Sequence, residues 1–310
     1  MTQHIRVILE YFHPWTNSAG FFYAREQGWY EEVGLDVELA TYDSARGDTL
    51  AYLNRGEAQF GIFPTNRLLV LREKTEGPSV VGVAAINHGG METIQTLKKT
   101  GIQTPADLSG KRIAMNPTPR GLAMVKQLIA ANGGVPEFEV VDAGVREYEA
   151  HDLDAGVADA TFGSYWGWEL LLKSSVPDEE RIIWPVDTIG APKYHSYLLG
   201  VNEEFLSEQP EVVEKFLAIT ARGFLAVAKE PQLAASVYEK TIPYFPQYLI
   251  ESSLPKIATS WTRDGKWGEQ YDDVMQEYSD WLYDNGILNQ KDGWKSSYTN
   301  KYLPKERVLI

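Results

Sequence analysis

Cysteine is absent from this chain of 310 residues. The chain therefore forms no disulfide, no cysteine-ligated zinc or iron–sulfur site and no thiolate nucleophile, and cysteine usage does not indicate its redox compartment. Long apolar runs are absent too, since none reaches the roughly 18 residues that a membrane span needs. We predict no direct insertion into a membrane.

Basic residues are scarce relative to acidic ones. There are 29 Lys and Arg against 43 Asp and Glu, which gives a formal net charge of −14. Such a surface repels phosphate backbones, so nucleic acid is not an expected partner. A disordered chain is excluded because 44% of the residues are hydrophobic and 12% are aromatic. The length suffices for two lobes of about one to two hundred residues each.

Motifs for metal binding and nucleophilic catalysis are also missing. No two histidines stand four residues apart, as they do on a zinc-binding helix. No Gly-x-Ser-x-Gly elbow is present. His13 and His195 suit either acid–base work or hydrogen bonding, and we favour the latter. We predict no catalytic residue, no metal and no cofactor.

The first residues enter a strand-like segment directly, with no signal peptide and no lipidated cysteine. We therefore expect one of two locations. The protein is cytoplasmic, or a leader has been removed and the protein is periplasmic or otherwise extracytoplasmic.

Strands alternate with helices along the chain, which is typical of an α/β fold. The first strand is expected over 6–10, a helix over 19–29 and a second strand over 35–39. Further strands are expected over 58–63, 80–86, 112–115 and 194–201, and helices over 48–54, 122–131 and 210–229. The aromatic-rich segment after Pro231 is expected to be helical and to pack on the first lobe.

One short pattern occurs twice, 100 residues apart: Leu-x-x-Gly-x-Ala begins at Leu53 and again at Leu153. Each copy suits a helix end, a glycine in a left-handed cap and a strand. The two copies indicate one supersecondary unit in each half of the chain. The alternative is that this pattern is simply a common helix-to-strand turn.

These features predict two α/β lobes. Lobe one comprises residues 1–88 plus 200–310, and lobe two comprises 89–199, with hinge crossovers near 86–95 and 194–201. In open α/β sheets ligands bind beyond the carboxyl ends of the strands, so we expect the ligand cleft there, between the lobes.

The loops after the predicted strands are largely aromatic and neutral. Flat rings and amide or hydroxyl groups together suit a planar heteroaromatic ligand that is stacked and recognised at its edge. The alternative is that these aromatics only fill the lobe interface. The predicted ligand-binding residues are Trp15, Asn17, Ser18, Phe63, Thr65, Asn66, Asn116, Thr118, Arg120, Tyr165, Trp166, Glu169, Tyr194 and His195.

Two of these positions allow more than one interpretation. The segment 116–121 lies at the N-terminus of the following helix, whose free N–H groups favour an anion, and Arg120 adds positive charge there. Two prolines remove donors from this segment, so a polar contact to a neutral ligand is as plausible. Arg120 also suits a solvated helix start. Glu169 suits either an acceptor for an aminopyrimidine edge or an acid that a helix dipole favours.

The opening of the chain resembles a known family. The segments NSAG at 17–20, AREQGWY at 24–30 and EEVGLDV at 31–37 are similar to the opening of the thiamine-pyrimidine-precursor family of ABC-transporter substrate-binding proteins. Further similarity covers 56–62, 107–113, 158–160 with Tyr165, Trp166 and Glu169, and Pro192-x-Tyr194. The resemblance spans about residues 5 to 235 and implies a two-lobe, type II-like periplasmic-binding-protein fold.

The resemblance also implies a function and its rivals. It implies capture of a thiamine pyrimidine precursor or a related compound for an ABC permease. The fungal pyrimidine synthase shares the fold, but its pyridoxal-phosphate lysine and its histidine correspond here to Phe63 and Arg67, and its cysteine-rich iron motif cannot exist in this chain. Ser18 replaces a histidine of many relatives. The rivals are a cytosolic enzyme acting on a small aromatic acid and a ligand sensor.

Overall fold

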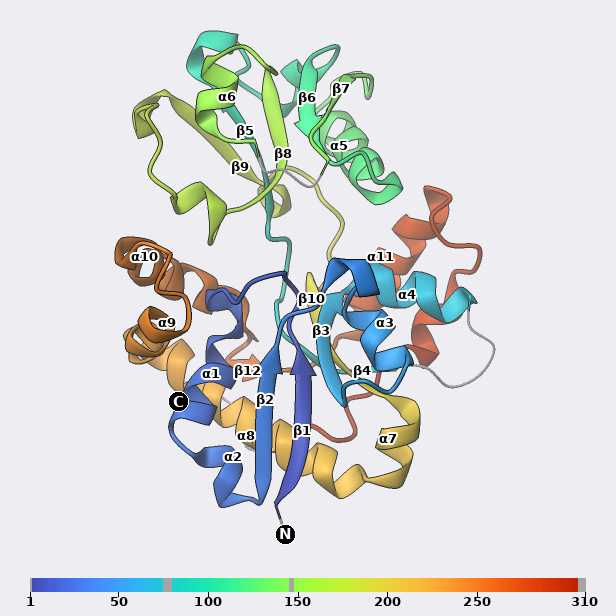
Figure 1. The fold of residues 1–310 in the computed structure, drawn as a ribbon. Coiled ribbons are helices and arrows are strands. Elements are labelled where there is room, and N and C mark those ends of the chain that lie inside the picture. The colour runs from blue at the N-terminus through green and yellow to red at the C-terminus, as the bar shows by residue number, and fades with distance from the viewer. Residues whose placement is uncertain (1, 75–79, 145–147, 306–310) are drawn as a thin grey trace. The chain divides into compact units, whose positions relative to one another are not determined.

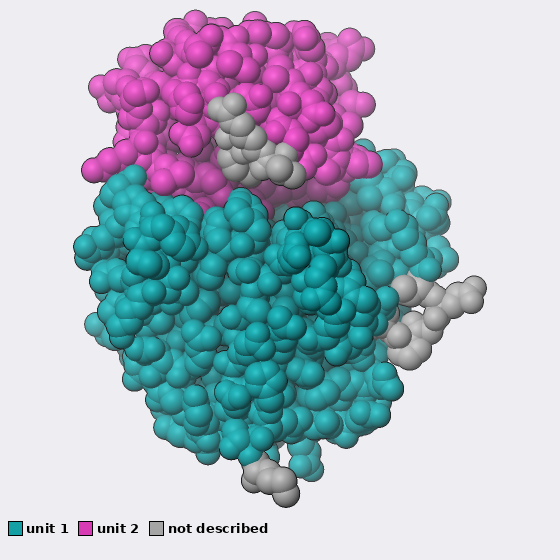
Figure 2. All heavy atoms as spheres, in the orientation of Figure 1, with its two compact units in different colours: residues 1–89, 194–310 teal, residues 90–193 magenta. Residues whose placement is uncertain are grey.

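The computed structural model describes residues 2–74, 80–144 and 148–305. The chain divides into two compact units, residues 1–89 with 194–310 and residues 90–193, which Figure 2 colours separately. The chain therefore leaves unit 1 after Gly89 and returns to it at Tyr194. No helix in the described ranges is long and apolar enough to cross a membrane.

Unit 1 is built on a mixed five-stranded sheet with the order β2-β1-β3-β10-β4 (Figure 1). Strands β1 (Gln3–Ile8), β2 (Leu35–Ala40) and β3 (Phe60–Pro64) are parallel. Strand β10 (Tyr197–Asn202) runs antiparallel to both β3 and β4 (Val80–Ala85). The carboxyl ends of β1, β2 and β3 therefore meet at one edge of the sheet.

Helices surround this sheet, and several of them begin at capping residues or prolines. Asp48 accepts a hydrogen bond from the Ala51 amide at the start of α3, and Pro210 begins α8. The helices of unit 1 are α1 (Ala19–Glu26), α2 (Trp29–Glu32), α3 (Thr49–Asn54), α4 (Thr65–Lys74), α7 (Glu203–Glu208), α8 (Pro210–Lys229), α9 (Ala235–Thr241), α10 (Gln247–Ile257) and α11 (Asp272–Asp284), and a small hairpin is formed by β11 (Thr262–Arg263) and β12 (Lys266–Trp267).

Helices α1 and α8 pack closely because two glycines face each other. A Cβ atom on Gly223 would stand 2.1 Å from the Gly20 carbonyl oxygen, and a Cβ on Gly20 would stand 2.3 Å from the Phe224 ring. Both distances are far below van der Waals contact, so only glycine permits this approach. The contact fixes α1 directly after the loop that follows β1.

Unit 2 repeats this plan with other strands. Its sheet has the order β7-β6-β8-β5-β9, in which β6 (Arg112–Met115) is parallel to β7 (Glu139–Asp142) and β8 (Ala160–Tyr165). Strand β5 (Glu92–Leu97) runs antiparallel to β8 and β9 (Arg181–Pro185). Helices α5 (Pro119–Ala131) and α6 (Ala150–Asp154) complete the unit. Each sheet thus has three parallel strands followed by an antiparallel one.

The repeated sequence pattern forms the same turn in both units. Gly56 between α3 and β3 has φ 68°, and Gly156 between α6 and β8 has φ 75°, so both adopt the left-handed conformation that glycine favours. The prediction of one supersecondary unit in each half is confirmed by these two helix–glycine–strand segments.

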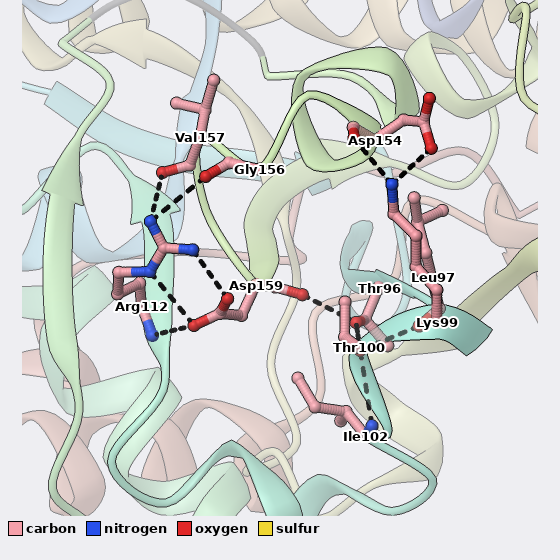
Figure 3. A network of polar contacts seen from close by, with 10 residues as sticks. All are labelled: Thr96, Leu97, Lys99, Thr100, Ile102, Arg112, Asp154, Gly156, Val157 and Asp159. Atoms are coloured by element: carbon pink, nitrogen blue, oxygen red, sulfur yellow. Dashed lines mark hydrogen bonds and ion pairs between the residues drawn. The ribbon is translucent and has the colours of Figure 1, made fainter.

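A side chain directly before the strand fixes this turn to the neighbouring parallel strand. In unit 2, Asp159 accepts from the Arg112 backbone amide at 2.9 Å and from its guanidinium at 2.8 Å (Figure 3). The Asp159 amide also donates to the Arg112 carbonyl at 2.8 Å. In unit 1, Gln59 holds Arg6 in the same way, with 2.8 Å and 3.1 Å for the two backbone bonds. The same two hydrogen bonds, one to the side chain and one from the backbone amide of the residue before the strand, therefore align β1 with β3 and β6 with β8.

Some strand boundaries differ from those expected. The first strand covers Gln3–Ile8 rather than 6–10, so Glu10 lies beyond the strand. Strand β10 begins at Tyr197 rather than at 194. Helix α8 and strand β6 have the expected bounds, and the sequence reasoning did not identify β5, β7 and β9 as strands.

Candidate functional site

A buried polar network lies at the carboxyl end of β1. Asn17, in the short 3₁₀ helix Thr16–Ser18, donates from Nδ2 to Glu10 Oε1 at 2.8 Å and to Asn87 Oδ1 at 3.0 Å. Ser18 Oγ donates to Glu10 Oε2 at 3.2 Å. Asn17 Oδ1 accepts from Asn87 Nδ2 at 2.7 Å and from Trp261 Nε1 at 3.2 Å. Asn17 therefore binds the loop after β1 to the segment that follows β4, and Ser18 holds Glu10 within that loop.

The acidic group of this network is Glu10, which is only 6% exposed. Burial raises the pKa of its carboxyl, and the hydrogen bonds from Asn17 and Ser18 act in the opposite direction. Tyr42, which follows β2, is half-buried, and burial raises the pKa of its hydroxyl. Charges on Arg67, Asp48 and Glu10 also influence that pKa, which places Tyr42 among charged groups at this edge of the sheet.

The loop after β1 also presents a cluster of aromatic rings. Phe12 is 60% exposed, and its ring centroid lies 4.3 Å from that of Tyr11 and 4.8 Å from that of His13. His13 in turn lies 4.9 Å from Phe245, which contacts Tyr244, itself 66% exposed. Large exposed rings at the carboxyl edge of a sheet are suited to stacking a planar ligand.

Several predicted ligand-binding residues of unit 1 are buried in its interior. The Trp15 side chain is 1% exposed, and the Trp15 carbonyl accepts from Tyr238 Oη at 2.5 Å. Phe63 packs against Gly200, where a Cβ would stand 2.3 Å from its ring. Tyr194 is 3% exposed and stacks on Tyr278 with the ring centroids 4.8 Å apart. These three rings contribute to packing.

Thr65 and Asn66 begin α4. Thr65 Oγ1 donates to the His195 carbonyl at 2.6 Å and is buried, whereas Asn66 is half-buried. The Asn66 side chain makes no hydrogen bond within the described ranges. Asn66 thus offers its amide at the same edge of the sheet as Glu10 and Tyr42.

His195 lies in a buried ring cluster beside His88. Their centroids are 5.1 Å apart in a T-shaped contact, and His195 Nε2 accepts from the Tyr271 amide at 3.3 Å. Burial lowers the pKa of His88 to about 4 and that of His195 well below its usual range, and the nearby Arg263 adds to both shifts. Both imidazoles are therefore neutral at ordinary pH and suit packing and hydrogen bonding.

In unit 2, Tyr165 ends β8 and Trp166 follows it directly, and both are half-buried. The Tyr165 amide donates to Glu169 Oε2 at 2.8 Å, and Trp166 Nε1 donates to the Gly90 carbonyl at 2.9 Å. Gly90 also donates its amide to Asp187 Oδ2 at 2.8 Å. Because its Nε1 is anchored, the Trp166 ring is held in a defined orientation.

Arg120 forms an ion pair with an acidic residue of the same unit. It forms a hydrogen-bonded ion pair with Glu92, in which the Arg120 and Glu92 side chains are only 14% and 15% exposed. Thr118 Oγ1 caps α5 by accepting from the Gly121 amide at 3.1 Å, and Asn116 is exposed. The alternative of a solvated Arg120 is thus wrong, because the side chain is paired and largely buried, and the positive charge at this helix start is neutralised.

Further polar groups line a hollow in unit 2 together with Glu169. Arg181 Nε donates to Gln95 Oε1 at 2.8 Å on its wall, and Ser164 contributes a third polar side chain. The remaining lining residues are Tyr148, Glu149, Ala150, Leu170, Leu172 and Ser174. This hollow lies wholly within unit 2.

The structure thus joins Asn17 with Ser18, Thr65 with His195, and Tyr165 with Glu169. Sequence reasoning missed Glu10, Asn87, Phe12 and Glu92. A signal exists for Glu10 and Phe12, because both lie in the loop after the first strand, but the alternation of residues 6–10 extends the predicted strand to Glu10. Within the described ranges, no cluster of three or more His, Asp or Glu side chains is arranged to hold a metal ion.

Comparisons with known sequences identify a family. The NMT1/THI5 like family model matches residues 15–234. A formylaminopyrimidine-binding protein of Halalkalibacterium halodurans is 24% identical over 92% of this chain and 86% of its own length. A 4-amino-5-hydroxymethyl-2-methylpyrimidine phosphate synthase of Saccharomyces cerevisiae is also 24% identical, over 91% of this chain and 83% of its own. The family predicted from the opening motifs is confirmed.

Comparisons with solved structures identify the fold. The aliphatic sulphonate-binding protein SsuA of Escherichia coli superposes with a TM-score of 0.72 at 14% identity, covering 100% of this chain and 96% of its own. The alkanesulfonate-binding protein SsuA of Xanthomonas axonopodis gives 0.68 at 14% identity, covering 96% and 98%. The predicted periplasmic-binding-protein fold of type II, with two mixed α/β lobes, is confirmed. At these identities the similarity concerns the fold alone.

Proposed function

We propose that this chain, which belongs to the NMT1/THI5-like family, is the solute-binding protein of an ABC importer that captures a small planar heteroaromatic ligand. The ligand is a thiamine pyrimidine precursor or a related compound bearing an amino group. The permease of such an importer is the proposed protein partner, and the protein acts outside the cytoplasm.

The observation that carries the ligand class is the charge pattern at the carboxyl edges of the two sheets. Arg120 is neutralised by Glu92, while Glu10 is buried and Glu169 and Asp187 accept backbone hydrogen bonds. Carboxylates are acceptors, so these edges favour a ligand that donates hydrogen bonds, such as an aminopyrimidine. A sulfonate or phosphate would meet mainly acceptors.

Ring stacking is assigned to two exposed or half-buried groups. In unit 1 the candidate is Phe12 with its aromatic neighbours, and in unit 2 it is Trp166, held by Gly90. Edge recognition is assigned to Asn66 and Glu169, while Asn17 and Ser18 position the loop. This proposal moves Trp15, Phe63 and Tyr194 from direct stacking to support of the surrounding structure.

The residues that connect the two units are proposed to act as a hinge. Both connections lie next to Gly89 and Tyr194, and the isolated bridges of His88 and Gly89 with His195 hold the two connecting segments together within unit 1. Closure about such connections on binding is the usual behaviour of two-lobe binding proteins.

One alternative function has specific support, because pyrimidine phosphate synthases are among the relatives. Native mass spectrometry of freshly purified protein separates the two. An unmodified, stoichiometric heteroaromatic of pyrimidine size supports the importer protein. A bound acid found together with its decarboxylated or dehydrated product favours an enzyme, and an empty protein that ignores added pyrimidines contradicts the proposed ligand.

A further inference from the structure

Glu10 is a buried carboxyl without a cationic partner. It is 6% exposed, and its side-chain hydrogen bonds come from the neutral groups of Asn17, at 2.8 Å, and Ser18, at 3.2 Å. The Trp15 side chain also favours its ionised form. Asn17 and Ser18 are themselves fully buried. None of the ion pairs among the described residues includes Glu10.

Other charged groups near Glu10 leave this charge uncompensated. A negative charge on Glu10 would raise the pKa of both Tyr42 and Tyr238. Both hydroxyls are neutral at ordinary pH because burial also raises their pKa values. Arg67, the cation that acts on Tyr42, is already paired with Asp48 at 3.0 Å. Burial has the largest effect on the pKa of Glu10 itself.

A buried carboxyl without a counter-ion costs stability whenever it is ionised, and such a cost is commonly retained where function needs it. Replacement by a glutamine would preserve the size of the side chain while removing the cost of burying a charge. Glu10 also stands two residues after the end of β1, at the edge where parallel strands place ligand-binding groups. The position of Glu10 and the cost of burying its ionised carboxyl together indicate a role in ligand binding.

We propose that Glu10 determines which charge the ligand carries: it selects a ligand that is cationic or that takes up a proton on a ring nitrogen as it binds. This inference rests on the proposed function and specifies it. The ligand supplies the positive charge that the protein itself does not place beside Glu10.

The physical reason is that the field of a buried carboxylate decays slowly, because little water screens it. A 4-aminopyrimidine spreads the charge of a protonated ring nitrogen onto its exocyclic amine, so the whole edge becomes a donor. Its 4-oxo analogue has no comparable basic nitrogen. Glu10 should therefore distinguish two ligands of nearly the same shape.

The test is calorimetric titration of the full chain with 4-amino-5-hydroxymethyl-2-methylpyrimidine and with its 4-oxo analogue, in two buffers of different ionisation enthalpy. The wild-type protein is expected to prefer the amino compound by at least about tenfold and to take up a proton on binding it. Glu10→Gln is expected to lose that preference and the proton uptake.

The matched control is Glu57→Gln, which removes one negative charge from the loop before β3, at the opposite edge of the sheet. It should leave the preference unchanged. Circular dichroism and the thermal midpoint of each variant verify that it is folded. If Glu10→Gln proves unfolded, Ser18→Ala, which removes one of the hydrogen bonds to the carboxyl, should change the preference and the proton uptake, and unchanged values in it overturn the inference.

The outcomes separate this inference from the proposed function. Equal affinity of the wild-type protein for the two analogues, or a preference that Glu10→Gln retains, overturns the role of Glu10 and leaves the pyrimidine-binding function standing. A wild-type protein that binds neither compound overturns the proposed function, and this inference falls with it.

Discussion

At the scale of single residues, burial decided which predicted side chains remain available to a ligand. Aromatic and polar residues in the loops after strands were identified from sequence because the carboxyl edge of an α/β sheet is where ligands bind. Sequence patterns could not distinguish Trp15, which is 1% exposed, from Trp166, which is half-buried. The burial of Trp15 depends on contacts with α9, whose Tyr238 bonds to the Trp15 carbonyl although the two residues lie more than two hundred positions apart in the sequence.

Trp166→Ala should weaken ligand binding by about 1–3 kcal/mol, because it removes the stacking ring proposed for unit 2. Trp166→Phe keeps an aromatic ring and loses only the hydrogen bond from Nε1 to Gly90, so it should retain most of the affinity. Calorimetric titration measures both. Unchanged affinity in the alanine variant would mean that the Trp166 ring does not contact the ligand.

The buried histidines make stability sensitive to acid. Burial depresses the pKa of His88 from the ordinary value of 6.5 to about 4. The folded state therefore holds the neutral imidazole more strongly than the unfolded state does, and the stability that this provides is present above pH 6.5 and is lost as the pH falls toward 4.

His88→Phe should accordingly reduce the fall in thermal midpoint between pH 7 and pH 4, by an amount corresponding to about 1–3 kcal/mol. The exposed His4, whose pKa is raised by Asp36, provides the control, because His4→Asn should not relieve the acid sensitivity. Identical pH profiles for the wild-type protein and His88→Phe would show that His88 is not held neutral by burial.

At the scale of elements, the strongest sequence signals gave the best boundaries. Helix α8 has the expected bounds Pro210–Lys229 because a proline begins it and its apolar residues keep a helical period. Strand β7 was missed because it lies at the edge of its sheet and is largely exposed, so no alternation of apolar residues reveals it. Strand β5 was missed because polar residues such as Gln95 are buried in it.

Gly223→Ala should destabilise the protein by about 1–3 kcal/mol, since its Cβ would overlap the Gly20 carbonyl across the contact of α1 with α8. Gly293→Ala is the matched control, because a Cβ there meets no atom within 4 Å. Urea denaturation should show a lowered midpoint for the first variant and almost no change for the second. Equal midpoints would contradict the close packing of these helices.

At the scale of the whole molecule, each unit has the same sheet plan, and the repeated Leu-x-x-Gly-x-Ala pattern was the sequence feature that indicated it. The pattern was visible because a left-handed turn restricts its position to glycine. The equivalence of Gln59 and Asp159, which fix the two turns to Arg6 and Arg112, was not visible, because an amide and a carboxylate perform the same task.

The central claim is that the protein captures an amine-bearing heteroaromatic molecule without transforming it. The most direct measurement is calorimetric titration of the purified protein with 4-amino-5-hydroxymethyl-2-methylpyrimidine and with an alkanesulfonate, followed by mass spectrometry of the recovered ligand. We expect one-to-one binding of the pyrimidine, its recovery unchanged, and no binding of the alkanesulfonate. Preferential binding of the alkanesulfonate, or conversion of the pyrimidine by catalytic amounts of protein, would contradict it.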